Sequence, residues 1–76
     1  MSERYLYLVE ATLEGCNKPA IGFFARRKDA VRMADGGEDA KIWRLELYLW
    51  KSDKFMTLQT FKDRAERINK HGDKIL

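Results

Sequence analysis

The run Ala40–Trp50 restricts the fold of this chain more than any other segment, because apolar side chains alternate along it over eleven residues. Strict alternation of this length is typical of a β-strand, in which successive side chains point to opposite faces. One face of this strand carries only apolar residues, namely Trp43, Leu45, Leu47 and Leu49. The other face carries Ile42, Arg44, Glu46, Tyr48 and Trp50. We predict a central strand whose Trp43 face is buried in the core.

Two further strands are predicted on the N-terminal side of this run. Arg4–Leu13 and Ala20–Ala25 are rich in the aromatic and branched residues that favour strands. The segment between them, 14–19, is a cluster of turn-forming residues with the sequence EGCNKP, so we predict an antiparallel hairpin. Along the first strand the face with Tyr5 stays apolar while the face with Leu6 becomes polar. We therefore expect the Tyr5 face to be buried.

A short helix is predicted over Arg26–Ala34, because the spacing of the apolar residues changes there from two to that of a helix. The apolar stripe consists of Ala30, Val31, Met33 and Ala34. The remaining surface is basic and consists of Arg26, Arg27, Lys28 and Arg32. The glycines in Asp35-Gly36-Gly37 are expected to end the helix in the left-handed conformation.

The C-terminal third predicts a helix that begins near Thr60 and ends at His71-Gly72, with Thr60 as the N-cap. Residues 55–59 are interpreted as a weak strand. The alternative is a single long helix capped by Ser52. Residues 73–76 are expected to fray.

Together these elements predict one α+β domain over residues 1–76. Its sheet is a single antiparallel or mixed layer of three or four strands with two helices, in the order β-β-α-β-(β)-α. If the second and third predicted strands are parallel neighbours, a right-handed crossover is expected.

The composition excludes several classes of protein. No apolar run approaches the roughly 20 residues of a membrane helix, and the first residues lack the pattern of a secretory signal. A single cysteine cannot form an internal disulfide, so we expect a cytoplasmic protein. The net charge is +3, from 15 basic and 12 acidic residues, which raises the possibility of a nucleic-acid ligand.

Catalytic and metal-binding parts are scarce. Cys16 and His71 are each the only residue of their type, and nothing in the pattern brings them together. Glu10 and Glu46 could face each other across strands, but a surface pair beside Arg44 explains them more simply. We expect neither enzyme activity nor a cofactor nor a metal site.

A patch on the outer face of the central strand is the strongest functional signal. Tyr48 and Trp50 lie there beside Arg44, and Leu6 and Leu8 join them if the two strands are neighbours. In one interpretation the C-terminal helix covers this patch with Phe61, Ala65 and Ile68. In the other the patch binds another protein or a second copy, since Trp, Tyr and Arg dominate interface energetics.

The basic helix face supplies the remaining predicted contacts. Arg27, Lys28 and Arg32 could bind phosphates or an acidic partner, although a charged helix face is also typical of plain solvent exposure. Single-strand nucleic-acid binding, with Tyr48 or Trp50 stacking on bases, is the alternative function.

The segment FARRKDAV (24–31), placed after a hairpin and before a strand like Ile42–Tyr48, resembles small phage and prokaryotic proteins with a hairpin–helix–strand core. Some anti-CRISPR proteins share this size and element order. The chain departs from that pattern, since Ala25 or Arg26 stands where such proteins often have a serine cap. The resemblance implies a phage-type accessory protein that binds a larger host protein stoichiometrically, without an assignment of site residues.

Overall fold

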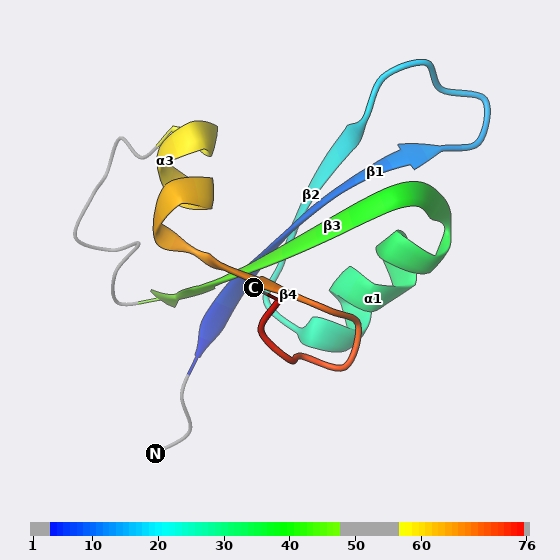
Figure 1. Cartoon of the computed structure of the whole chain (residues 1–76). Coiled ribbons are helices and arrows are strands. Elements are labelled where there is room, and N and C mark those ends of the chain that lie inside the picture. The colour runs from blue at the N-terminus through cyan, green and yellow to red at the C-terminus, as the bar shows by residue number, and fades with distance from the viewer. Residues whose placement is uncertain (1–3, 48–56, 76) are drawn as a thin grey trace.

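Four antiparallel strands form one sheet that carries a helix on each face (Figure 1). This computed structural model describes residues 4–47 and 57–75. Its strands are β1 (Tyr5–Leu13), β2 (Ala20–Phe24), β3 (Gly37–Glu46) and β4 (Glu66–Ile68). Its helices are α1 (Arg27–Asp35) and α3 (Leu58–Arg64). The predicted α+β class and the antiparallel hairpin are confirmed.

The strand order is β2-β1-β3-β4, so β1 lies between β2 and β3 and is antiparallel to both. β2 and β3 therefore run in the same direction, and α1 connects them across one face of the sheet (Figure 1). Of the two sheet types predicted, the antiparallel one is present among the described strands. β2 and β3 are not neighbours, because β1 separates them.

Two hydrophobic clusters lie on opposite faces of the sheet. The cluster beneath α1 consists of Tyr7, Val9, Ala11, Ala30, Ala34, Ile42 and Ile68. The cluster beneath α3 consists of Leu8, Trp43, Leu45 and Phe61, with Leu6 and Ala65 packed against it. The sheet is thus covered on both sides, which lets a short chain bury both faces of its central strands.

The prediction that one core contains both the Tyr5 face and the Trp43 face is wrong. Leu6 lies opposite Leu45, whereas Tyr7 lies opposite Arg44. Directly opposed residues share a face, so this register places Leu6 on the Trp43 side, away from Arg44. The predicted grouping of Leu6 and Leu8 with the Arg44 patch is wrong for the same reason.

The sheet carries a helix on each face, but the prediction that the C-terminal helix covers the Arg44 patch is wrong. Phe61 and Ala65 cover the cluster that contains Leu8 and Trp43, as a helix folding back would do. Ile68 packs in the cluster beneath α1 instead. A continuous helix cannot place Phe61 and Ile68 on opposite faces of a sheet, so the chain becomes extended between them.

The predicted extent of the C-terminal helix, from near Thr60 to His71-Gly72, is therefore wrong. α3 ends at Ala65, whose φ of −84° and ψ of 161° are extended, and β4 follows and pairs with β3. The N-cap is Thr57 rather than Thr60, because the Thr57 hydroxyl accepts from the Thr60 amide at 3.1 Å. Of the strand predicted over 55–59, residues 58–59 lie in α3, and 55–56 lie outside the described residues, as does the alternative cap Ser52.

The junction between α1 and β3 also differs from the prediction. Gly36 has a φ of −85°, so it does not adopt the left-handed conformation, and β3 begins at Gly37 rather than at residue 40. Among non-glycine residues of the described chain, Asp39 alone has a positive φ, 52°. β3 ends at Glu46, and residues 48–50 of the predicted strand lie outside the described residues.

The C-terminal segment is tied to β4. Lys74 forms a bridge with Ile68, and the Ile75 amide donates to the Arg67 carbonyl at 2.8 Å. Residues 73–75 are therefore hydrogen-bonded where fraying was predicted. Leu76 lies outside the described residues.

Candidate functional site

β2 forms one edge of the sheet. β2 stands at the end of the strand order, and no described strand pairs with its outer side. An edge strand presents unpaired N–H and C=O groups that can pair with another chain.

One hydrogen bond shows which backbone groups of β1 face β3 and which face β2. The Leu47 amide donates to the Arg4 carbonyl at 3.0 Å, so Arg4 and every second residue after it turn their backbone groups toward β3. The residues between them, such as Val9, turn theirs toward β2. Because Val9 lies opposite Gly22, Gly22 is bonded to β1, and the backbone groups of Ile21 and Phe23 point outward.

The side chains of these same two residues are also exposed. Ile21 is 40% exposed and Phe23 is 52% exposed. Phe23 lies opposite Leu8, so both side chains are on the α3 face of the sheet. The Phe23 ring meets the Phe61 ring edge-on, with centroids 5.7 Å apart. An apolar strip thus continues from the α3 core to the open edge.

The opposite face of β2 is anchored to α1. A Cβ at Gly22 would lie 2.6 Å from the Sδ atom of Met33, so only glycine lets the helix side chain approach this closely. Pro19 directly precedes β2, in a position where proline is compatible with an edge strand. β2 is therefore held firmly by β1 and α1 while its outer edge stays open.

Arg44, one of the predicted partner-binding residues, makes its contacts within the chain. Its Nη2 atom is 2.9 Å from the Glu66 carboxylate, its Nη1 atom donates to the Gly72 carbonyl at 3.3 Å, and its guanidinium lies 4.8 Å from the Tyr5 ring centroid. The bond from Arg44 lowers the pKa of Glu66, and the same bond raises the pKa of Arg44. Arg44 thus links β3 to β4 and the C-terminal turn.

The other predicted contact residues are dispersed. Arg27 donates to the His71 carbonyl at 2.6 Å and so links α1 to the C-terminal turn. Lys28 and Arg32 are exposed on α1, and no ion pair found among the described residues involves either. Tyr48 and Trp50 lie outside the described residues. Arg27 and Arg44 therefore both donate to backbone carbonyls of the C-terminal turn after Ile68, at His71 and Gly72.

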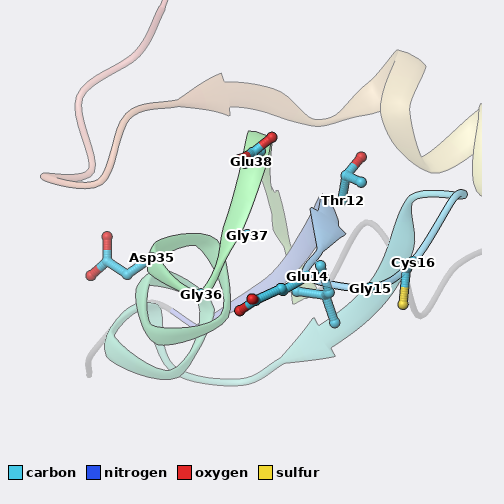
Figure 2. Close-up of a pocket in the computed structure, with 9 residues that line it drawn as sticks. Thr12, Glu14, Gly15, Cys16, Asp35, Gly36, Gly37 and Glu38 are labelled. Carbon is cyan, nitrogen blue, oxygen red and sulfur yellow. The ribbon is translucent and has the colours of Figure 1, made fainter.

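A pocket of about 510 Å³ lies where the β1–β2 turn meets the α1–β3 junction. Figure 2 shows that its carboxylates, on Glu14, Asp35 and Glu38, point in different directions, and that Cys16 lies at the end of the pocket away from Asp35. Within residues 4–47 and 57–75, no group of three or more His, Cys, Asp or Glu residues is placed to hold a metal ion.

The candidate catalytic pairs of the sequence do not form contacts in the described structure. Cys16 is exposed in the β1–β2 turn, and no contact found among the described residues joins it to His71. Glu10 lies opposite Lys41 and bonds to Lys62 at 2.8 Å, so it does not face Glu46. The acidic pair is thus two separate surface carboxylates.

Comparisons with protein-family models, with curated proteins and with solved structures found no match for the chain. In the part of the chain that the structure describes, no helix is long and apolar enough to cross a membrane.

Sequence reasoning missed Ile21 and Phe23 as exposed residues. Their apolar type marks them as core in a pattern-based prediction, because alternation alone cannot distinguish a central strand from an edge strand. A weak signal was available, since the strand is short, follows Pro19 and contains Gly22, all of which favour an edge.

Proposed function

We propose that the chain is a non-enzymatic protein-binding module that pairs an extended segment of another protein with the open edge of β2. The observation that carries this proposal is the coincidence of outward backbone groups and exposed apolar side chains at Ile21 and Phe23. Strand addition uses main-chain hydrogen bonds for affinity and side-chain contacts for specificity. Proteins commonly protect such edges with charges, and the segment 20–25 carries none.

The resemblance in element order supports a more specific setting for this module. We propose a phage-type accessory protein that acts in the host cytoplasm and inhibits a larger host protein by stoichiometric binding. Occlusion of this kind needs no catalytic group. Arg27 and Lys28 begin α1, which follows β2 after two residues, and would extend the contact surface. Tyr48 and Trp50 remain predicted contacts, and binding through a second copy remains an outcome of the tests below.

The test is site-specific photo-cross-linking in the cells that produce the protein. A photoreactive phenylalanine analogue replaces Phe23 on the β2 edge or, as a matched control, the exposed Lys41 on β3. We expect one defined protein adduct from position 23 and none from position 41. Adding Ile21→Pro should abolish the adduct, because proline removes the outward N–H without touching a bond to β1. Equal adducts from both positions, or none from position 23, would refute the edge as the binding surface.

Nucleic-acid binding is the second candidate function. The exposed Lys28 and Arg32 on α1, together with Arg26 at its N-cap, favour it. If it holds, a labelled single-stranded oligonucleotide should bind at low salt, weaken steeply as salt is added, and be lost in a Lys28→Glu, Arg32→Glu double variant. Ile21→Pro should leave this binding unchanged. The same oligonucleotide is not expected to bind if the protein-binding function is correct.

A further inference from the structure

The charge around β2 points to the chemistry of its partner. We propose that the β2 edge takes an extended segment of another protein, apolar at alternate positions and acidic at both ends, rather than a second copy of this chain. This inference rests on the proposed function, since it specifies the partner for the same edge. Its observations are the outward backbone groups of β2 and the distribution of charge on either side of it.

The geometry of the edge sets the alternation in the partner. A strand paired with Ile21 and Phe23 would place every second side chain on the α3 face, beside these two exposed residues. The ring of Phe61, whose centroid lies 5.7 Å from that of Phe23, continues this apolar surface toward the core. An apolar side chain there would remove exposed surface on both molecules from water. A charged side chain at that position would lose hydration without gaining a partner.

The two ends of β2 are basic. Residues 15–28 contain no Asp or Glu, and their basic residues are Lys18, Arg26, Arg27 and Lys28. Lys18 lies two residues before β2 begins, and Arg26 lies two residues after it ends. Both side chains are exposed. A partner strand that covers β2 would bring its own flanking residues near a cation at each end, so carboxylates are favoured there.

The contribution of these flanks can be estimated. An opposite-charge pair across two strands is worth roughly a 1.4- to 5-fold change in equilibrium constant, so two pairs give about 2- to 30-fold. The effect should weaken as salt is added, because the flanking side chains are exposed to solvent. A difference of this size is measurable by direct titration.

A second copy of the chain fits this edge poorly. In the symmetric antiparallel register, Ile21 of one copy lies opposite Phe23 of the other, with the two-fold axis at Gly22. The same register brings Lys18 near Arg26 at both ends, just outside the paired strands, and nearby like charges destabilise the pair. A shift of one register step instead brings Lys18 toward the N-terminus of α1, which begins with Arg27 and Lys28. The shift in the other direction aligns Phe23 with Pro19, which has no N–H to donate.

The test uses two fluorescein-labelled nine-residue peptides with the same core of alternating Val and Thr. One carries two Glu at each end and the other carries two Lys at each end. Fluorescence anisotropy at about 50 mM salt should show at least about twofold tighter binding of the Glu-flanked probe, and the difference should shrink at about 500 mM salt. A Lys18→Glu, Arg26→Glu double variant should reverse the preference.

Two further variants test whether the probe occupies the edge. Ile21→Pro should abolish binding of the Glu-flanked probe, whereas Ile21→Thr keeps the N–H and should weaken it only in part. Circular dichroism establishes that each variant is folded. Phe23→Pro replaces Ile21→Pro if the latter does not fold, since its N–H also points outward.

The outcomes separate this inference from the proposed function. Equal binding of the two probes, tighter binding of the Lys-flanked probe, or no binding of either at about 1 mM would overturn the acidic partner. The cross-linking at Phe23 would still decide the edge itself. A stable dimer in light scattering that is lost in Ile21→Pro would overturn the inference in favour of a second copy. Unchanged binding of the Glu-flanked probe to Ile21→Pro would overturn both.

Discussion

Replacing Gly37 with alanine should destabilise the protein, whereas the same change at the adjacent Gly36 should not. A Cβ on Gly37 would lie 2.8 Å from the Ala11 Cβ and 3.1 Å from the Leu13 Cδ2. Carbon atoms prefer separations of about 3.5–4.0 Å, so the β1–β3 pair would have to shift apart. A Cβ on Gly36 would meet nothing closer than the Met33 carbonyl oxygen at 3.6 Å, and its φ is negative.

The expected magnitudes follow from these contacts. Overpacking at a site like Gly37 costs about 1–3 kcal/mol, and the reduced entropy of the unfolded chain returns about 0.4–1 kcal/mol. The midpoints of these ranges leave a net loss of about 1.3 kcal/mol of unfolding free energy, or roughly 5–10 °C in Tm for a domain of this size. Gly36→Ala has only the entropic term and should gain up to about 1 kcal/mol.

Thermal melts followed by circular dichroism, together with urea titrations, measure both variants against the parent protein. Equal shifts for Gly36→Ala and Gly37→Ala, or a Gly37→Ala variant as stable as the parent, would refute the close approach of β3 to Ala11. The comparison is sharp because the two positions are neighbours and the chemical change is identical.

Three further predictions concern the C-terminal half. Ile68→Val should lower the free energy of unfolding by about 0.5–1.5 kcal/mol in urea titrations, because Ile68 is 1% exposed; no loss would contradict its place beneath α1. Thr57→Ala should cost about 0.5–2 kcal/mol through the lost N-cap, whereas Ser at this position should restore it. The hydrogen bond from Arg44 lowers the pKa of Glu66. The Arg44–Glu66 pair therefore stabilises the fold above the ordinary glutamate pKa of about 4.3, and this stabilisation is lost as the pH falls through the lower pKa of the folded state. Urea titrations across that range should show a small acid loss that Glu66→Gln removes, and an equal loss in both proteins would contradict the pairing.

Elements whose pattern is local could be predicted from the sequence. The hairpin around residues 14–19 follows from turn-forming residues between two strand-forming runs, and α1 follows from the spacing of Ala30 and Ala34. The end of α3 could not be predicted in this way. Phe61, Ala65 and Ile68 recur at helical spacing, yet Ile68 is buried on the other face of the sheet, which only an extended segment after Ala65 can reach.

The open edge of β2 also shows which features follow from the local sequence and which depend on pairing between distant segments. Alternation identified β2 as a strand, because the period of two is a property of neighbouring residues alone. Its position at the end of the sheet depends on the pairing of β1 with β3, which joins residues far apart in the sequence. A slip of one residue in such a pairing exchanges the two faces of a strand. The sequence alone therefore determined where the chain is extended or helical. Only the tertiary structure decided that Leu8 is covered while Ile21 and Phe23 stay open, since burial depends on which distant segments meet.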